Sequence, residues 1–292
     1  MQLTTASQGF DLTVLCDNDA AQGLRNVHGL CMLLKAPDVC VLLDCGPDAT
    51  AVSNADALGV DLSQVDAIVL SHGHVDHTGG LEHVLERTGA VRIVAHPAVF
   101  ERTYSCRAGA EPHDIGMPMP RESYERMGAT FELTQASVSL GSVFATTGEV
   151  PRPDPRQAIT SHLLRQTGES LEPDAMPDDM SVIARLDDGA VIVTGCAHAG
   201  LMNIVAHAQA LTGLRRIHGI FGGTHLVAFD NEGVRAMARD LAAAGVRALG
   251  PCHCTGPQAT RVLHDCFDGL VLPLKAGDAL HFKGTGEFDV TS

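Results

Sequence analysis

The chain has 292 residues, with 35 acidic side chains against 20 lysines and arginines, so its formal net charge at pH 7 is −15. This length is compatible with one long domain, and a hydrophobic content of 45% allows a substantial core. The negative charge argues against broad binding of nucleic acids, although a local basic pocket for a single phosphate stays compatible with it.

Nine cysteines, an odd number, are scattered along the chain without the spacing of a disulfide scaffold. The N-terminus lacks the basic region and apolar run of a signal peptide, and no apolar stretch approaches the length that spans a bilayer. We therefore expect a cytoplasmic protein that acts on a small molecule and binds neither membrane nor nucleic acid. The sequence leaves the oligomeric state open.

The first part of the chain alternates apolar runs with turn residues. These runs predict strands at residues 11–16, 30–35, 39–44 and 65–70. Residues 48–58 predict a helix, which Gly59 ends. Asp44 closes the third strand, where its carboxylate either supports a neighbouring ligand loop by a hydrogen bond or lies in water as an ordinary turn residue.

Three histidines and an aspartate are crowded into the turn after the fourth strand, and a helix is predicted next at 81–87. His72 and His74 are two apart in extended backbone, so they point the same way and can bind one cation. Asp76 and His77 follow where the chain bends and can face a second cation. Imidazole and carboxylate ligands suit zinc, iron or manganese. A polar loop facing water is the alternative, but so many polar groups at a strand end are hard to satisfy without a metal.

The middle of the chain is less regular. A strand is predicted at 91–96, and shorter ones at 131–133, 137–140 and 143–147. Residues 104–120 and 168–179 show no periodicity, and the first of these stretches is either a lid or binding loop or a variable surface insertion. His96 and His113 are not expected to bind metal.

The second half repeats the pattern of strands followed by helices. A hairpin is predicted at 181–186 and 190–194, further strands at 217–221 and 246–249, and helices at 201–211 and 232–244. Histidines His198, His225 and His253 follow three of these strands beside small residues, as His72 and His74 do earlier. Loops at one edge of a sheet stack can converge on a single cleft. We predict two stacked β-sheets flanked by helices, as one domain of two similar halves, residues 1 to about 135 and 136–292.

These residues resemble a known family. The stretch His72-Gly73-His74-Val75-Asp76-His77 after a strand, with Leu42-Leu43-Asp44-Cys45-Gly46 upstream, resembles the metallo-β-lactamase superfamily. The resemblance is closer to one branch of this superfamily. That branch is labelled 7,8-dihydropterin-6-methyl-4-(β-D-ribofuranosyl)aminobenzene 5'-phosphate synthase-like metal-dependent hydrolases. The chain is similar to it at Asp17-Asn18, His28-Gly29-Leu30, Asn54-Ala55, Thr194-Gly195-Cys196-Ala197-His198, Gly222-Gly223-Thr224-His225-Leu226 and Gly250-Pro251-Cys252-His253-Cys254-Thr255-Gly256. The resemblance covers nearly the whole chain and implies the αββα metallo-β-lactamase sandwich, with a two-metal site at the sheet edge.

The resemblance also implies a ligand set. His72 and His74 match ligands of the first metal, Asp76 and His77 match ligands of the second, and His253 matches the last histidine, which completes the second site.

The middle of the pattern departs from the superfamily. Thr147-Gly148-Glu149 and Thr194-Gly195-Cys196 stand near the positions of an expected histidine and a bridging aspartate. We predict His198 as the missing ligand. Cys196 is either a thiolate ligand or a small buried residue at a strand end. His225 is placed either to contact substrate or to bind metal, and His28 is a weaker case of the same kind.

Such a site implies two divalent metal ions, zinc first and iron or manganese as alternatives, that share a water held as metal-bound hydroxide. Asp76 is the predicted orienting base, and His225 the predicted donor to a developing oxyanion or leaving group. We therefore predict a metallohydrolase that acts on a small ester, lactone, thioester or phosphoester.

Several other functions remain open at this stage. The branch name suggests a synthase, or transferase, that joins a pterin-like compound and an arylamine, but a label shared across a branch is weak evidence for a substrate. Iron-dependent oxygen chemistry uses a similar loop, whereas the charge of −15 disfavours a nuclease. A non-catalytic metal sensor is the last alternative, and retention of Asp76 counts against it.

Overall fold

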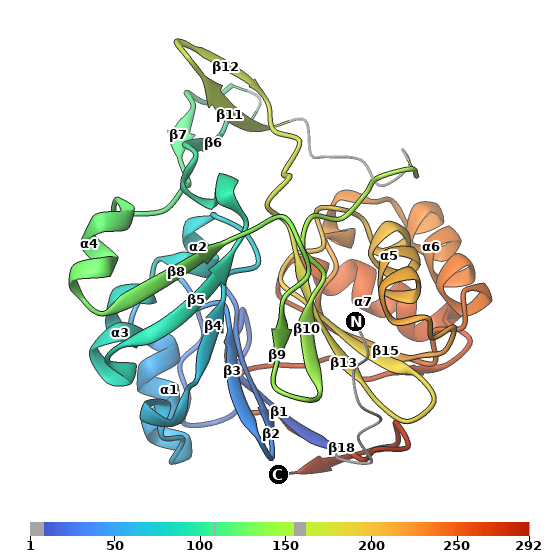
Figure 1. Ribbon diagram of the computed structural model, residues 1–292. Coiled ribbons are helices and arrows are strands. Elements are labelled where there is room, and N and C mark those ends of the chain that lie inside the picture. Colours follow the sequence, from blue (N-terminus) through green and yellow to red (C-terminus); the bar gives the residue numbers. More distant parts are fainter. Residues whose placement is uncertain (1–8, 108, 155–161, 292) are drawn as a thin grey trace.

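A computed structural model describes residues 9–107, 109–154 and 162–291 of the protein. Two large sheets stack face to face, and helices cover both outer faces (Figure 1). This arrangement confirms the predicted sandwich.

The first sheet has the strand order β19-β18-β1-β2-β3-β4-β5-β8. Its strands are β1 (Phe10–Cys16), β2 (Cys31–Ala36), β3 (Val39–Leu43), β4 (Ala67–Val69), β5 (Val91–Ala95), β8 (Ala129–Leu133), β18 (Ala279–Phe282) and β19 (Phe288–Thr291). The last two come from the C-terminal end of the chain and pair beside β1, so this sheet is not built from the first half alone. The similarity of the two halves stays a prediction.

The second sheet has the strand order β17-β16-β15-β14-β13-β10-β9. Its strands are β9 (Ser139–Leu140), β10 (Phe144–Thr146), β13 (Ser181–Arg185), β14 (Ala190–Thr194), β15 (Ile217–Gly223), β16 (Ala248–Cys252) and β17 (Leu270–Val271). The strands from β14 to β17 run parallel, so their carboxyl ends point to the same edge of the sheet.

Helices pack on the outer faces of the sheets (Figure 1). The helices are α1 (Thr50–Leu58), α2 (Val75–Thr78), α3 (Leu81–Thr88), α4 (Arg121–Arg126), α5 (Leu201–Thr212), α6 (Asn231–Ala243) and α7 (Pro257–Cys266). Helix α7 is absent from the sequence-based prediction. Among the helices of the described ranges, none combines the length and apolar character needed to cross a bilayer.

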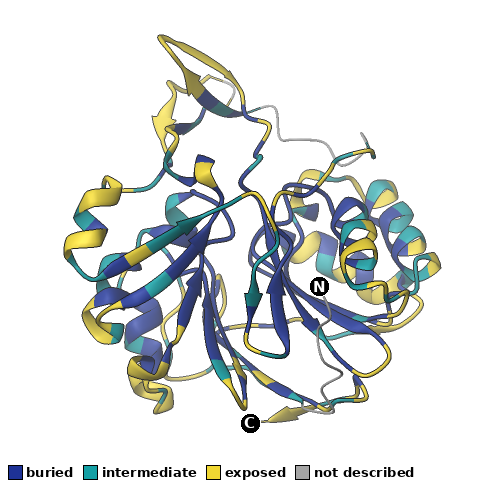
Figure 2. Ribbon diagram, in the orientation of Figure 1, coloured by how far each residue is buried: buried dark blue, intermediate teal, exposed yellow. Residues whose placement is uncertain are grey.

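Strand β14 shows how the sequence builds these layers. Val191 and Val193 point to the core between the two sheets, whereas Ile192 points to the core beneath α5 and α6. Successive strand side chains alternate between faces, and a strand covered on both faces is apolar throughout. The strand is therefore buried along its whole length, and Figure 2 shows the central strands of both large sheets as mostly buried.

A third, smaller sheet corrects the prediction of irregular structure at 104–120 and 168–179. Strands β6 (Thr103–Ser105), β7 (His113–Asp114), β11 (Leu163–Thr167) and β12 (Ser170–Pro173) form a projecting sheet with the order β12-β11-β6-β7 (Figure 1). The pairing of β11 with β6 joins segments far apart in the sequence, which local periodicity cannot reveal. His113 lies exposed on this sheet.

Arg165 of β11 ties the projecting sheet to the body of the protein. Its Nε donates to Asp174 Oδ1 at 2.8 Å, and its Nη2 donates to Asp178 Oδ1 at 3.0 Å. The other oxygen of Asp178 accepts the backbone N–H of Gly73 at 2.9 Å. Arg165 therefore stabilises, through the buried Asp178, the turn between His72 and His74.

Candidate metal centre

The predicted site residues meet where strands of both large sheets end. The chain leaves β4 through an extended segment that carries His72 and His74, and α2 then begins at Val75 with Asp76 and His77 in its single turn. The second sheet contributes Cys196 and His198 after β14, His225 after β15 and His253 after β16. The structure thus brings together all of the predicted metal ligands from the ends of β4, β14 and β16, with His225 beside them after β15.

The first donor group consists of His72, His74 and His198. One nitrogen from each ring lies within 4.8 Å of the others, and His72 Nε2 is 3.1 Å from His74 Nδ1. The His198 Nε2 atom is buried and has no hydrogen-bond partner among the described residues. Burial lowers the pKa of His74 to about 4 and that of His198 well below its ordinary value, so both rings are neutral at pH 7. Neutral imidazole is the form that binds a metal.

The second donor group consists of Asp76, His77 and His253. His77 Nε2 lies 3.2 Å from His253 Nε2 and 3.7 Å from Asp76 Oδ2, and His253 Nε2 lies 3.4 Å from the same oxygen. Burial alone would raise the pKa of Asp76, but the neighbouring His77 and His253 hold it well below its ordinary value. In the same way the pKa of His77 rises to about 9 against the effect of burial, because Asp76 and Asp44 favour the charged ring. This group therefore carries a carboxylate that attracts positive charge.

Buried polar residues fix the orientation of these ligands. Asp44 is fully buried, and its Oδ2 lies 2.7 Å from His77 Nδ1 while Ser71 donates from its N–H and Oγ to the two carboxylate oxygens. Asn18 Oδ1 lies 2.9 Å from His253 Nδ1. Each contact occupies the outer ring nitrogen and leaves Nε2 facing the centre, as in known metal sites. Asp44 is thus a supporting residue, not a solvated turn residue.

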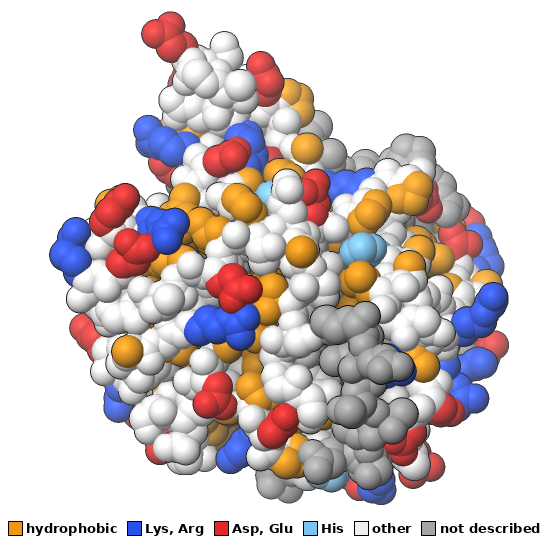
Figure 3. All heavy atoms as spheres, viewed as in Figure 1, with side chains coloured by type: hydrophobic (Ala, Val, Ile, Leu, Met, Phe, Trp, Pro, Cys, Tyr) orange, Lys and Arg blue, Asp and Glu red, His pale blue; other side chains and the backbone are white. Residues whose placement is uncertain are grey.

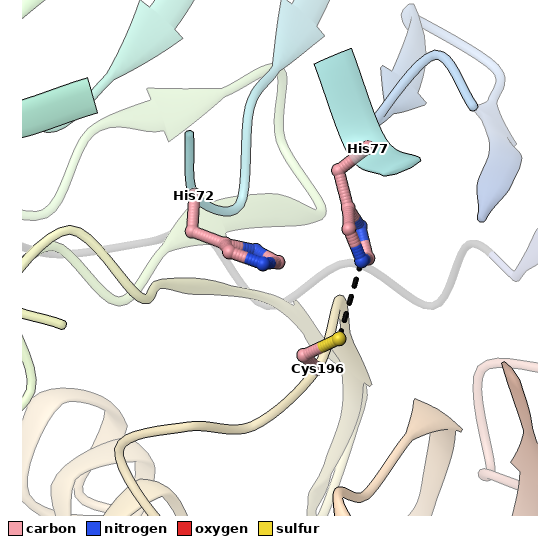
Figure 4. Close-up of side chains that lie close together, drawn as sticks. All are labelled: His72, His77 and Cys196. Atoms are coloured by element: carbon pink, nitrogen blue, oxygen red, sulfur yellow. Dashed lines mark hydrogen bonds between the residues drawn. The ribbon is translucent and has the colours of Figure 1, made fainter. Parts of the chain in front are cut away.

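Cys196 lies between the donor groups and the second sheet. Its Sγ is 3.1 Å from His77 Nε2, and His72, His77 and Cys196 point toward one another in Figure 4. Cys196 also belongs to a second cluster, which we call the thiol cluster and which consists of Cys196, His225 and Cys254. One donor atom of each of these residues lies within 4.8 Å of the others. Cys196 is therefore both a buried strand-end residue and a potential ligand.

The remaining histidines differ in their distance from the centre. The His225 ring lies 4.3 Å from the His198 ring, measured between centroids, whereas His28 is 69% exposed and places its Nε2 3.4 Å from Asp76 Oδ2. His96 is buried beside Glu149, with 3.3 Å between His96 Nε2 and Glu149 Oε2, and belongs to none of the potential ligand groups found among the described residues.

Four residues near the centre had no role assigned from sequence: Asn18, Cys254, Asp178 and Asp179. Asp179 is buried, and its Oδ2 accepts the N–H of Ala199 at 2.9 Å, next to His198. Sequence reasoning missed it because it lies in an acidic, proline-rich stretch that was predicted to be irregular. Asn18 and Cys254 stood within segments that carried the family resemblance.

The donor set fits divalent metal ions. The inward-facing atoms are ring nitrogens and a carboxylate oxygen, the buried His198 Nε2 lacks a partner among the described residues, and each outer nitrogen of His72, His77 and His253 has its own. Zinc prefers such nitrogen and oxygen ligands. A cation here would satisfy groups that would otherwise remain unpaired in the interior.

A separate groove lies at the base of the projecting sheet. It has a volume of about 650 Å³, and its lining includes Phe100, Met117, Met119 and Arg121. Hydrophobic side chains gather on this part of the surface beside α4 in Figure 3. None of the residues of the two donor groups lines it, so the groove is distinct from the centre.

The fold and this arrangement of ligands are those of a metallo-β-lactamase-type protein. The chain matches the model of the metallo-beta-lactamase superfamily over residues 24–253, and it belongs to that superfamily. The fold therefore implies binding of a divalent metal.

Individual relatives extend this finding over most of the chain. The chain is 25% identical, over 264 residues, to 7,8-dihydropterin-6-methyl-4-(β-D-ribofuranosyl)-aminobenzene-5'-phosphate synthase of Methanocaldococcus jannaschii, covering 87% of this chain and 90% of that protein. Tm1679, described as a metal-dependent hydrolase of the β-lactamase superfamily, superposes with a TM-score of 0.80 at 24% identity, covering 94% of this chain and 99% of Tm1679. Zn²⁺-bound PqqB from Methylobacterium extorquens gives a TM-score of 0.57 at 13% identity, covering 92% and 99%. These two structures show the shared fold.

Proposed function

We propose that the protein is a metal-dependent hydrolase that cleaves a small ester, lactone, thioester or phosphoester. The first donor group would hold one divalent ion and the second donor group another, with zinc favoured by the donor types. Bound divalent ions supply two kinds of chemistry here, since they make water nucleophilic at neutral pH and polarise the bond under attack.

Asp76 is the residue that carries this proposal. Its side chain is 21% exposed, whereas those of His77 and His253 beside it are fully buried, so substrate and water reach the centre on the Asp76 side. The low pKa that His77 and His253 impose keeps the carboxylate ionised at neutral pH. An ionised carboxylate at this position can accept a hydrogen bond from the attacking water and orient it, as a general base does.

His225 has a complementary role in the proposal. Its ring lies against the His198 ring, and its Nδ1 has no hydrogen-bond partner among the described residues. A ring N–H directed at the reacting oxygen would stabilise the negative charge that develops there. His28, exposed beside Asp76, lies where it can contact the bound substrate.

Turnover of model substrates tests the proposal. The purified, zinc-loaded protein is assayed on p-nitrophenyl acetate, an acyl lactone, an acyl thioester and p-nitrophenyl phosphate. We expect hydrolysis of one of these classes, and a decrease in kcat/KM of about 10²–10⁴-fold for Asp76→Asn, which keeps the shape of the side chain but not its basicity. The control is Asp268→Asn, an exposed residue outside the centre. Equal turnover by wild type and Asp76→Asn would contradict the role of Asp76.

The similarity to the M. jannaschii synthase supports a second candidate, a synthase that joins a pterin-like compound and an arylamine. Fold similarity does not transfer a substrate, so this candidate rests on that one relative. Incubation with a reduced pterin and an arylamine, followed by mass spectrometry, distinguishes it. A condensation product in the absence of ester hydrolysis would replace the hydrolase proposal.

A further inference from the structure

The thiol cluster lies at the ends of three neighbouring parallel strands of the second sheet. Cys196 follows β14, His225 follows β15 and Cys254 follows β16, each within two residues of the strand end. One donor atom of each residue lies within 4.8 Å of the others. Two sulfur atoms and one ring nitrogen therefore converge in the interior beside the two donor groups, which they meet where Cys196 contacts His77 and where the His225 ring lies against the His198 ring.

Unusual backbone geometry maintains this convergence. Among the described residues, five non-glycine residues have positive φ. Three of them belong to or adjoin the thiol cluster: Ala197 (59°), His225 (52°) and His253 (47°). Residues other than glycine adopt this region at an energetic cost, and such residues cluster at functional sites. The backbone strain is concentrated where the three donors are brought together.

A close approach of backbone supports the same geometry. A Cβ atom added to Gly223, the last residue of β15, would lie 2.7 Å from Cys254 Sγ and 2.2 Å from the carbonyl oxygen of Gly195. Only glycine leaves room for the sulfur at this point. The sequence therefore places the smallest residue where Cys254 must approach the strand.

The polar atoms of the group are incompletely paired. Cys254 Sγ accepts the backbone N–H of His225 at 3.2 Å, whereas His225 Nδ1 is buried without a partner among the described residues. The Cys254 thiol also lies 3.6 Å from the carbonyl oxygen of Cys196. The thiolate is the form that binds metal, so a metal bound here would displace the proton of this thiol.

We propose that Cys196, His225 and Cys254 form a further metal site that binds a soft divalent cation such as zinc. Two thiolates and one imidazole are a donor set that zinc uses with its fourth position open. Cys196 Sγ also lies 3.1 Å from His77 Nε2, so its thiolate would be close to a metal held by the second donor group as well. Coordination of His225 through one ring nitrogen leaves the proton on the other, which preserves the donor role proposed above.

The donor types select the metal. Thiolate ligands favour zinc over magnesium, calcium and manganese, which prefer oxygen donors. A site of this kind adds positive charge beside His198 and His77 without using their nitrogens. It would make the centre a cluster joined through sulfur.

Metal content and spectroscopy test this site without reference to turnover. The purified full-length chain is loaded with Zn²⁺, desalted and analysed for zinc by mass spectrometry. A parallel sample is loaded with Co²⁺, whose charge-transfer absorption reports bound thiolate. We expect Cys254→Ser to bind one zinc fewer per chain than wild type and to lose part of the cobalt–thiolate absorption. The control Cys40→Ser alters a buried thiol at the start of β3 and is expected to match wild type in both measurements.

A second variant keeps the test decisive if Cys254→Ser does not fold, as judged by circular dichroism. His225→Gln leaves both thiols in place and is expected to show the same loss of one zinc. Wild-type zinc content in the folded variants, with unchanged cobalt absorption in Cys254→Ser, would overturn the proposal. These readouts are independent of the proposed hydrolase activity, since a chain that cleaves no tested substrate can still give either result.

Discussion

The two sheets contribute to the metal centre in different ways. The first sheet supplies His72, His74, Asp76 and His77 from six consecutive residues, which the buried Asp44 and Ser71 hold in place. The second sheet supplies its donors singly, at the ends of β14, β15 and β16. The first contribution is a local unit, whereas the second depends on the register of three strands. Variants that disturb one side at a time measure this difference.

The largest effect is expected from Asp44→Ala, beside the donors that the first sheet supplies. The substitution leaves the Ser71 N–H and Oγ and the His77 ring without their acceptor in a fully buried position. Breaking such a buried charged network lowers the free energy of unfolding by about 3–5 kcal/mol. Loss of ligand orientation lowers zinc affinity about 10–100-fold. Urea unfolding and zinc titration measure these effects, and Asp44→Asn, which keeps one acceptor oxygen, should fall between wild type and alanine.

The next largest effect is expected near the donors of the second sheet, where Asp179 makes the stability of the protein depend on pH. Burial raises the pKa of this carboxyl to about 6 from 3.8. Below pH 4 both folded and unfolded chains hold the proton, whereas between pH 4 and 6 only the folded chain does, so the residue lowers stability as the pH rises. The full cost above pH 6 is about 3 kcal/mol.

Asp179→Asn removes this titration. The variant is therefore expected to gain stability relative to wild type between pH 4 and 6 and to keep that gain above pH 6. Urea unfolding of chelator-treated protein at several pH values measures the difference. A difference that stays constant from pH 4 to 7 would show that the carboxyl titrates alike in both states.

The smallest effect is expected from Gly195→Ala, at the contact between the loops of the first and the second sheet. An added Cβ would lie 2.1 Å from Ser71 Oγ and 3.0 Å from Asp44 Oδ2, so the end of β14 must move away from the histidine loop. Overpacking of this kind lowers the free energy of unfolding by about 1–3 kcal/mol. Thermal unfolding measures it, with Gly116→Ala as control because its nearest neighbour, Thr103 Oγ1, is 3.3 Å away. Equal destabilisation by the two variants would show that the contact of Gly195 with Ser71 carries no special constraint.

Sequence reasoning was accurate where structure is local. The histidine loop and the two-sheet sandwich follow from periodicity and from donors crowded after one strand. The prediction of His198 as the missing ligand came from the family resemblance, and the structure brings its ring together with those of His72 and His74.

The features that could not be predicted depend on contacts between residues far apart in the sequence. The pairing of β11 with β6 joins residues 163–165 to 103–105, and no local pattern encodes it. Asp178 and Asp179 lie in a stretch that was predicted to be irregular, yet both are buried, where Asp178 pairs with Arg165 and Asp179 Oδ2 accepts the N–H of Ala199. Cys254 could not be distinguished from the other buried cysteines, because only the fold places it beside Cys196 and His225.

The salt-bridged contact of Arg165 has a consequence for protein engineering. Asp178 shares its two oxygens between Arg165 of the projecting sheet and the amide of Gly73 in the histidine loop. A graft that exchanges the projecting sheet for that of a relative must therefore carry an arginine at this position. Without it, an uncompensated buried carboxylate would be left against the backbone that separates His72 from His74.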